Sequence, residues 1–321
     1  MPLGEFDVIA RYFTRTTPRS DVLLGVGDDA ALLVPPAGET LVAATDTLVE
    51  GRHFLPGTPA NSVGHNALAA NLSDLAAMGA DPAWALLALS MPDADEAWLE
   101  AFARGLNGLA GRHGVALVGG DTVAGPLVVT VALLGFVPPQ AALRRSGAQP
   151  GDVVFVSGAP GVAAAGLDLL RRGEAPFTTD DPCVRRFLYA EPRLALGRAL
   201  RGHATAAMDV SDGLLGDLGK LARASNVAAS LHLDRLPIAP VLAARHDRDR
   251  CEHYVLHGGD DYELLFTLPP ERAEALAPLI AVQAGCGLHR IGEIAAGSGV
   301  RCLRHGRDAP VAGAGYDHFA R

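Results

Sequence analysis

The sequence has 321 residues, of which 49% are hydrophobic and 20% are charged, and its formal net charge is −9 at pH 7. The length exceeds what one ordinary hydrophobic core needs and predicts two domains of a well-buried fold. The negative charge argues against nucleic acid or an anionic membrane as the main partner, and the four scattered cysteines indicate neither a zinc knuckle nor a disulfide framework.

The first half of the chain alternates predicted strands with predicted helices. Segment 5–13 predicts an amphipathic helix, and its charges argue against the apolar core of a signal peptide. No later segment is a plausible membrane span, so we expect a cytoplasmic enzyme. Apolar runs predict strands at 21–26, 31–35, 40–49, 83–91, 115–121 and 127–137, with helices at 62–80 and 96–114 between them.

A stretch at 138–152 that contains prolines and glycines interrupts this pattern. We place a domain junction there, which gives an N-terminal domain of residues 1–138 and a C-terminal domain of residues 139–321. The alternation then resumes and predicts a mixed α/β sheet in each domain. In the second half, strands are expected at 152–158, 205–211, 228–233, 262–268 and 287–294, and helices at 161–173, 192–202, 212–225 and 271–282.

Aspartates recur at the ends of these strands and beside glycines. A turn or a helix cap explains any one of them, and Asp212 is a good cap by propensity alone. Their recurrence favours a ligand site, because glycines let the backbone approach a ligand and α/β proteins bind ligands at strand ends. The recurring acids are Asp28, Asp29, Asp46, Asp74, Asp121, Asp209, Asp212, Asp260 and Asp261.

Such an acidic site predicts a metal ion and a phosphate. Carboxylates repel phosphate unless a divalent cation lies between them, and magnesium is typically shared between a few carboxylates and substrate phosphates. Zinc would favour clustered His or Cys, which this sequence lacks. Arg144 and Arg145 in the junction are candidates for direct contact with phosphate, although such arginine pairs are more often simply solvated.

Two common nucleotide-binding motifs are rejected. The segment 25–30 matches the dinucleotide fingerprint G-x-G-x-x-A, but a short apolar run and two prolines follow it where the fingerprint needs a helix. The Walker pattern G-x-x-x-x-G-K-[ST] is absent from the sequence. If the protein uses ATP, metal ions must hold the phosphates without the usual glycine loop.

Several longer motifs resemble those of the thiamine-monophosphate kinases, which share a superfamily with aminoimidazole ribonucleotide synthetase and selenophosphate synthetase. The resemblance runs nearly end to end, and ATDTLVEGRHF together with NLSDLAAMGADP is a highly specific pair. The other similar stretches are GEFDVIARYF, GVGDDAALL, GGDT, SDGL, GGDDYELLF and GYDHF.

The resemblance implies ATP-dependent phosphorylation of thiamine monophosphate to thiamine diphosphate by direct in-line transfer, without a covalent nucleophile or a strong general base. It implies the two-domain fold of aminoimidazole ribonucleotide synthetase. In that fold the N-terminal domain forms a barrel with its twin in a homodimer, and the C-terminal domain completes the active-site cleft.

The resemblance also implies roles for individual residues. Several magnesium ions would be held by Asp29, Thr45, Asp46, Asp74, Asp121, Asp209 and Asp212. ATP would contact Gly120, Asp121, Arg145 and Ser211, and thiamine monophosphate would contact His53 and Asp260.

Three positions depart from the family pattern. Ala44 stands where the family often has a serine, so one side-chain metal ligand is missing, and water can take its place. Asp260 stands where the family usually has the longer glutamate. Gly313 stands where an aromatic residue usually contacts the thiamine. The last two changes affect the thiamine pocket rather than the phosphate chemistry.

Two sites carry more specific expectations. Asp46 interrupts a strand that its apolar neighbours predict to be buried, where an unpaired carboxylate would be costly, so a magnesium ion is its expected partner. Asp29 is expected to bind metal and Asp28 to be a structural neighbour, because adjacent strand residues point to opposite faces.

Two other classes of function are weighed against the kinase. A sister enzyme could use the same ATP platform on another substrate. Selenophosphate synthetase would carry a reactive cysteine or selenocysteine near its N-terminus, whereas the first cysteine here is Cys183. A metal or nucleotide sensor without catalysis would give no reason for so many acids.

Overall fold

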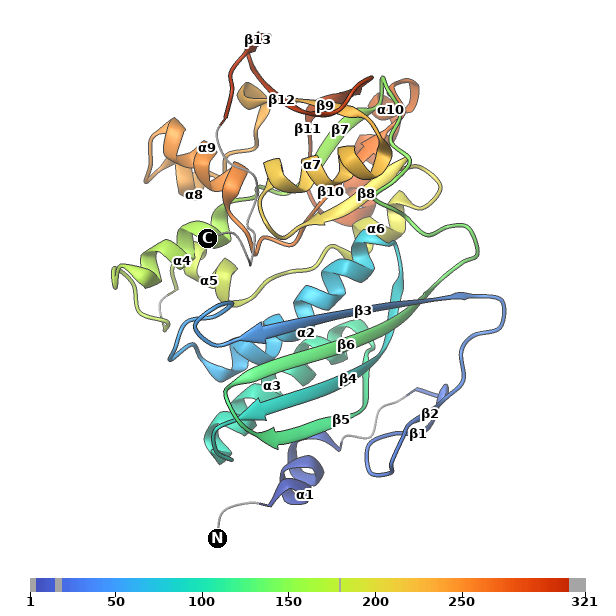
Figure 1. Ribbon diagram of the computed structural model, residues 1–321, viewed down its shortest axis with the longest axis vertical. Coiled ribbons are helices and arrows are strands. Elements are labelled where there is room, and N and C mark those ends of the chain that lie inside the picture. Colours follow the sequence, from blue (N-terminus) through green and yellow to red (C-terminus); the bar gives the residue numbers. More distant parts are fainter. Residues whose placement is uncertain (1–3, 15–18, 179, 312–321) are drawn as a thin grey trace. The chain divides into compact units, whose positions relative to one another are not determined.

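The computed structural model describes residues 4–14, 19–178 and 180–311 (Figure 1). It contains two compact units: unit 1 spans Met1–Leu75 and Ala80–Gln140, and unit 2 spans Ala76–Gly79 and Ala141–Arg321. Each unit combines β-strands with α-helices, which confirms the expected mixed α/β fold. In the described part of the chain, no helix is both long and apolar enough to cross a membrane.

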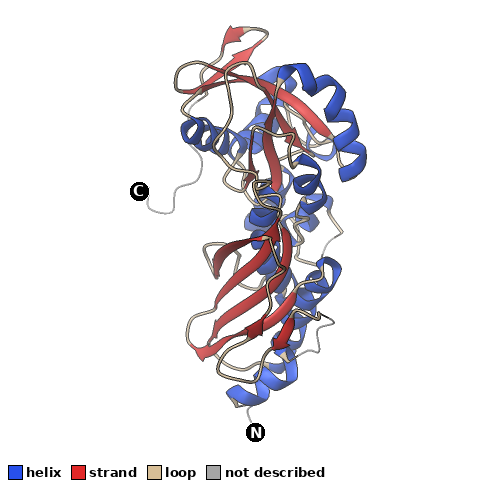
Figure 2. Ribbon diagram, turned by 90° about the vertical axis from the view of Figure 1, so that its right-hand side faces the viewer, coloured by secondary structure: helices blue, strands red, loops and turns tan. Residues whose placement is uncertain are grey.

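Unit 1 is built on a four-stranded sheet in the order β3-β6-β4-β5, with helices packed on one of its faces (Figure 2). β6 pairs antiparallel with both β3 and β4, and β5 runs parallel to β4. Leu87, Leu89 and Leu133 point to the helix side and are almost fully buried. The elements are β3 (Thr40–Val49), α2 (Ala60–Ala77), β4 (Asp81–Met91), α3 (Glu96–His113), β5 (Ala116–Ala124) and β6 (Val128–Val137).

The opposite face of this sheet is covered at one end. There the short ribbon of β1 (Val22–Leu24) and β2 (Leu32–Leu33) packs on Trp84 and Phe136, and the Trp84 indole donates to Asp21 Oδ1 at 3.2 Å. The rest of this face exposes apolar side chains. We call it the open face, and Leu41, Leu86 and Val123 on it are 49%, 39% and 49% exposed.

Helices α2 and α3 approach each other closely through glycines. A Cβ atom on Gly64 would lie 2.2 Å from the carbonyl oxygen of Phe102, and one on Gly105 would lie 1.8 Å from that of Asn61. No larger residue fits at either position without moving a helix. The N-terminal segment also packs against α3: α1 (Glu5–Val8) continues as a π-helical turn (Ile9–Phe13), and the Phe13 ring meets Phe102 edge-on at 6.3 Å.

Unit 2 contains a seven-stranded mixed sheet in the order β13-β12-β9-β11-β7-β10-β8. Its central strands are fully buried because helices cover them; α7, for example, packs on β8, β9 and β12. The strands are β7 (Val153–Ser157), β8 (Ala206–Val210), β9 (Ala228–His232), β10 (Glu263–Leu268), β11 (Leu288–Ala295), β12 (Gly299–Arg304) and β13 (Arg307–Asp308). The helices are α4 (Val162–Arg171), α5 (Pro182–Leu188), α6 (Leu194–Leu200), α7 (Leu214–Ser225), α8 (Pro240–Ala243), α9 (Arg248–His257) and α10 (Pro270–Ala284), with a 3₁₀ turn at Leu233–Arg235.

Most elements lie where the sequence predicts them, and five in unit 2 were missed: α5, α8, α9, β12 and β13. Helix α9 has many charged residues and therefore gives little apolar periodicity. Its burial depends on tertiary contacts, such as the ion pair of Glu252 with Arg304 of β12.

We expect Gly105→Ala to destabilise unit 1 by about 2 kcal/mol, because the new methyl group overlaps the backbone of α2. Gly108→Ala, one turn along the same helix, meets no atom within 4 Å and should stabilise the helix by up to about 1 kcal/mol. Urea unfolding followed by the fluorescence of Trp84 and Trp98 measures both. Equal effects of the two variants would contradict the close helix crossing.

Candidate active site

The first acidic pair of unit 1 joins strand β3 to helix α2. Asp46 of β3 is half-buried, and its side chain is hydrogen-bonded to that of Asp74. Burial raises the pKa of the Asp46 carboxyl, while the bond to Asp74 and the charge of His53 oppose that rise. Two adjacent carboxyl groups cannot both ionise freely without a cation. The pair is therefore suited to a divalent ion.

The burial expected for β3 is wrong in part. β3 is an edge strand, and Ala43 and Thr45 on its open face are exposed. The Thr45 hydroxyl donates to the carbonyl of Val131 in the neighbouring strand at 3.2 Å. Because Thr45 and Asp46 point to opposite faces of the sheet, the structure does not bring these two expected ligands together.

His53 lies in the turn that follows β3. Its Nδ1 atom accepts a hydrogen bond from the backbone N–H of Val49 at 3.0 Å, which fixes the ring. The imidazole is close enough for its charge to act on Asp46. This position beside the acidic pair suits a residue that contacts the substrate.

Gly120 and Asp121 lie on β5, at the other edge of the sheet from Asp46. The register runs across the four strands as Asp46–Val131–Leu87–Gly120. Three strand spacings separate the ends of this row, which is roughly 14 Å. Within one chain, Asp46 and Asp121 are therefore too far apart to bind the same ion.

A glycine is required at position 120. Its φ angle is +150°, and a Cβ atom there would lie 1.8 Å from the carbonyl oxygen of Leu87. The following residue, Asp121, is exposed, and its Oδ1 accepts a hydrogen bond from the N–H of Thr122 at 2.9 Å. The Asp121 carboxylate is therefore exposed, and this hydrogen bond uses only one of its two oxygens.

Asp29 lies in a bend and Asp28 in an isolated bridge to Val26, and neither belongs to a strand, so the expectation that they alternate between two faces does not apply. Both are exposed, and Asp28 Oδ1 accepts a hydrogen bond from the backbone N–H of Asp29 at 2.8 Å. The Asp28 side chain therefore supports the local backbone. The same bond uses only the backbone of Asp29 and not its carboxylate.

The candidate residues of unit 2 gather where β8 ends and α7 begins. Asp209 is a buried residue of β8, paired with Leu264 of β10. Ser211 and Asp212 form the turn after β8, and both of their backbone N–H groups donate to Asp217 Oδ2, at 3.0 and 3.1 Å. The sequence position of Asp212 predicts a helix cap, but its carboxylate does not cap α7. Its Oδ2 atom instead accepts a hydrogen bond from Lys220 at 2.5 Å.

Asp260 packs against the same turn. Its backbone N–H donates to the carbonyl of Ser211 at 3.1 Å, and its φ of +64° is in the left-handed region. Burial, and then repulsion from Asp212, raise the pKa of Asp260 to about 6. The Tyr262 hydroxyl lies 3.5 Å from Asp260 Oδ1. The structure thus brings Ser211, Asp212 and Asp260 together.

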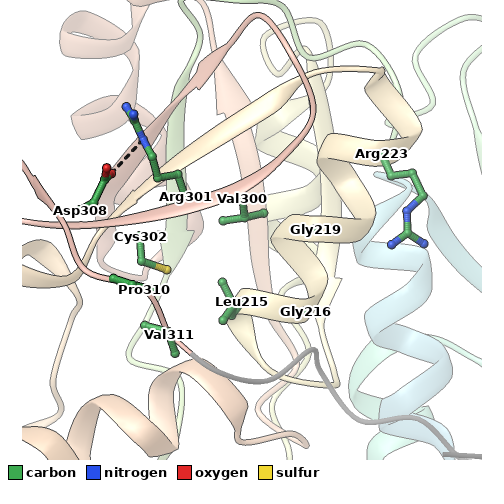
Figure 3. Close-up of a pocket in the computed structure, with 10 residues that line it drawn as sticks. All are labelled: Leu215, Gly216, Gly219, Arg223, Val300, Arg301, Cys302, Asp308, Pro310 and Val311. Atoms are coloured by element: carbon green, nitrogen blue, oxygen red, sulfur yellow. Dashed lines mark ion pairs between the residues drawn. The ribbon is translucent and has the colours of Figure 1, made fainter.

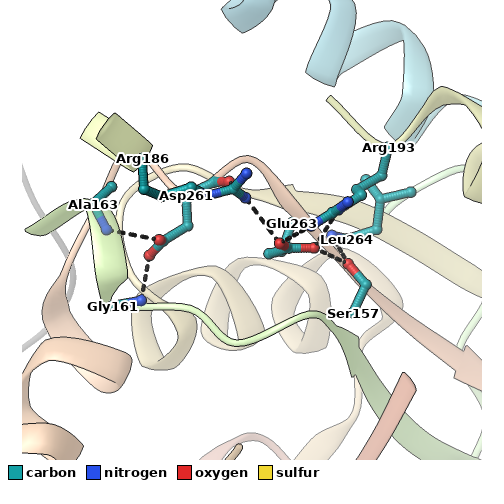
Figure 4. Close-up of polar contacts among 8 residues, drawn as sticks. All are labelled: Ser157, Gly161, Ala163, Arg186, Arg193, Asp261, Glu263 and Leu264. Carbon is teal, nitrogen blue, oxygen red and sulfur yellow. Dashed lines mark hydrogen bonds and ion pairs between the residues drawn. The ribbon is translucent and has the colours of Figure 1, made fainter. Parts of the chain in front are cut away.

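A buried polar network fixes the segment that follows Asp260 (Figure 4). The Asp261 carboxylate accepts from the N–H groups of Gly161 and Ala163 at the start of α4. Glu263 is 2% exposed and is held by Ser157 and by two arginines: Arg186 donates at 2.8 Å, and Arg193 donates twice at 2.6 and 2.5 Å. These bonds keep the pKa of Glu263 low although its burial favours the opposite. The strained conformation at Asp260 therefore rests on a rigid base.

Two further sequence candidates lie elsewhere. The Arg145 side chain is exposed in unit 2, and its carbonyl accepts from Ser225 Oγ at 3.0 Å. Gly313 is outside the described residues. A pocket of about 530 Å³ between α7 and β12, lined by Leu215, Gly219, Val300 and Cys302 among others, contains none of the expected site residues (Figure 3).

The donor chemistry fits magnesium that arrives with phosphate. In the described ranges, no three His, Cys, Asp or Glu side chains are grouped closely enough to form a complete metal centre. The pairs Asp46–Asp74 and Asp212–Asp260 supply oxygen donors only, and magnesium is commonly held by one or two carboxylates plus substrate phosphates.

Sequence reasoning missed Asp217 and Lys220. Asp217 is completely buried in α7, and Lys220 bridges it to Asp212. Their spacing of three residues in a predicted helix was an available signal for an ion pair. The link from Lys220 back to Asp212 depends on the turn geometry, which has no such signature.

Known proteins match the chain over almost its whole length. Residues 27–137 match the AIR synthase related protein, N-terminal domain, and residues 149–303 match the AIR synthase related protein, C-terminal domain. The thiamine-monophosphate kinase of Escherichia coli K12 is 46% identical and covers 100% of this chain and 99% of its own. This chain belongs to the thiamine-monophosphate kinase family.

Solved structures agree with this assignment. The crystal structure of thiamine-monophosphate kinase from Stenotrophomonas maltophilia K279a has a TM-score of 0.88 and 49% identity, covering 96% of this chain and 99% of its own. A structure described as AaThiL complexed with AMPPCP and TMP has a TM-score of 0.78 and 32% identity, with 89% of both chains covered.

The raised pKa of Asp260 predicts a pH-dependent loss of stability in the metal-free protein. The unfolded carboxyl ionises near its usual pKa of 3.8 and the folded one near 6, so stability falls as the pH rises between these values. Asp260→Asn removes the charge, and asparagine tolerates the left-handed φ. The variant should match the wild type at pH 4 and exceed it by about 2 kcal/mol at pH 7.5.

Urea unfolding followed by far-UV circular dichroism in the presence of a chelator measures this difference. A gap between the two proteins that is the same at every pH would contradict the assigned cause.

Proposed function

We propose that this chain transfers the γ-phosphoryl group of ATP to thiamine monophosphate, which gives ADP and thiamine diphosphate. The observation that carries this proposal is the 46% identity to a thiamine-monophosphate kinase across both full lengths. The solved relative complexed with AMPPCP and TMP supports both substrates. The acidic pairs in each unit supply the chemistry that two phosphate-bearing substrates need.

The transfer is direct and in-line. A terminal phosphate oxygen of thiamine monophosphate attacks the γ-phosphorus, the bond from that phosphorus to the β,γ-bridging oxygen breaks, and ADP leaves. The attacking oxygen is already deprotonated near neutral pH, so positioning and charge stabilisation outweigh base catalysis. His53 and Asp260 orient thiamine monophosphate, and Gly120, Arg145 and Ser211 contact ATP.

Magnesium, when bound, would neutralise the phosphate oxygens of both substrates. We assign its protein ligands to Asp29, Asp46, Asp74, Asp121, Asp209 and Asp212, with Thr45 as a weaker candidate because its hydroxyl already bonds to Val131. Among the described residues of the free protein, these acids come together only in pairs, such as Asp46 with Asp74. This supports the idea that the ions bind together with the substrates, whose phosphates supply further ligands.

We also propose that the protein is a homodimer formed by unit 1. Two features support this: the open face leaves Leu41, Leu86 and Val123 exposed, and β3 and β5 are the outer strands of its sheet. A second copy that pairs its β5 with β3 would cover this face. It would also bring Asp121 of one copy toward Asp46 of the other, which a single chain keeps roughly 14 Å apart.

We expect Asp46→Asn to lower turnover by roughly 10²-fold or more, about 3 kcal/mol, because a charged contact to the transferring group is lost. The measurement is formation of thiamine diphosphate from ATP and thiamine monophosphate, with a magnesium titration. Asp28→Asn is the control, since Asp28 bonds to the backbone of its neighbour, and it should retain most of the activity.

The melting temperature of metal-free Asp46→Asn should equal or exceed that of the wild type, because a half-buried acid is removed from a pair. Near-normal turnover with a collapsed melting temperature would show that Asp46 is structural. ATP consumption by the wild type that ignores thiamine monophosphate would contradict the proposed reaction.

For the dimer, we expect Leu86→Glu to shift the mass in solution from two 33.2 kDa chains to one, because an ionised carboxylate would be buried between the two open faces. Val282→Glu is the matched control, since Val282 on α10 is 83% exposed in unit 2. Sedimentation at micromolar concentration measures both variants. A fully active wild type with the mass of one chain would contradict the proposal.

A further inference from the structure

The turn between β8 and α7 is held by a residue of the helix that follows it. Gly213 precedes α7 with a φ of +102°, and no side chain caps the helix from that position. Asp217, in the first turn of α7, is fully buried and accepts the N–H groups of Ser211 and Asp212 on one oxygen. Asp217 thus fixes the backbone of Ser211, the proposed ATP contact, and of Asp212, the proposed metal ligand.

Lys220 completes this arrangement from one turn further along α7. Its Nζ lies 2.8 Å from the second oxygen of Asp217 and 2.5 Å from Asp212 Oδ2. The lysine side chain is 36% exposed, so its ammonium group can reach solvent without unfolding the helix. The ammonium group pairs with both aspartates, so it places a positive charge between them.

The position of this charge matters for the acids around it. Asp212 repels Asp260, and Lys220 places a positive charge on the Oδ2 atom of Asp212. A divalent ion that uses Asp212 meets a carboxylate already bound by a cation. Two cations a few ångströms apart repel each other strongly in a partly buried site.

We propose that the Lys220 ammonium group occupies the Asp212 carboxylate in the free protein and competes there with a divalent ion. The ion pair between Lys220 and Asp212 must weaken or break when the divalent ion binds. Lys220 then acts as a positioning residue that sets the concentration of divalent ion the enzyme requires. This inference rests on the proposed role of Asp212 as a metal ligand.

The test uses the full chain without nucleotide and Mn²⁺ as the probe, with free Mn²⁺ measured by electron paramagnetic resonance. Lys220→Gln keeps a hydrogen-bond donor and removes the charge, and Lys220→Met removes both. Both variants should bind Mn²⁺ more tightly than the wild type, by roughly 3- to 10-fold. Arg223→Met removes a like charge from the next turn of α7, where the side chain is exposed, and should change binding little.

A double-mutant cycle assigns the effect to the right carboxylate. If Lys220 acts through Asp212, Lys220→Gln should have no effect on Mn²⁺ binding in an Asp212→Asn background. In the otherwise unchanged protein, Lys220→Gln should also lower the magnesium concentration that gives half-maximal formation of thiamine diphosphate.

The outcomes separate this inference from the proposed function. A lysine with only a structural role predicts a lower melting temperature with Mn²⁺ binding unchanged or weaker, and that result would overturn the inference. An equal shift with Arg223→Met would also overturn it, because the effect would then be one of general charge. Formation of thiamine diphosphate by the wild type tests the proposed function independently of either result.

Discussion

Burial of carboxyl groups close to one another is the constraint on which the candidate site depends. In unit 1, Asp46 and Asp74 share a hydrogen bond, and burial raises the pKa of Asp46. In unit 2, burial and then repulsion from Asp212 raise the pKa of Asp260 to about 6. Acidic pairs of this kind cost stability in the free protein, which is what makes them candidates for a cationic ligand.

Other acids of unit 2 are buried just as deeply and show how the chain treats a carboxylate that has a structural task. Glu263 is matched by Arg186 and Arg193, and Asp261 by two backbone N–H groups. Removing one partner of such a network leaves a buried charge and costs several kcal/mol. The arginine partners keep the pKa of Glu263 low, and this part of the network is a rigid support, whereas burial raises the pKa of Asp46 and of Asp260.

The sequence predicted the order of most strands and helices because their apolar patterns are local. It also identified Asp46, Asp74, Asp212 and Asp260 as candidates, and the structure brings Asp46 to Asp74 and Asp212 to Asp260. It could not show that β3 is an edge strand, since the alternation of Ala43, Thr45 and Leu48 is compatible with burial on either side. Nor could it show that Lys220 reaches back eight residues to Asp212, because that contact requires the turn that Gly213 permits.

The edge position of β3 decides, more than any single contact, which acids of unit 1 can reach the same ligand. A four-stranded sheet with Asp46 at one edge and Asp121 at the other cannot join them through its own curvature, because two strands stand between them. Glycine at position 120 lets β5 lie close to the backbone of Leu87 in β4, which holds Asp121 at its edge of the sheet, away from Asp46. If both acids bind the same pair of phosphates, a second chain has to bring an Asp121 close to an Asp46. An apolar open face between the same two edges is the surface that a second copy would use.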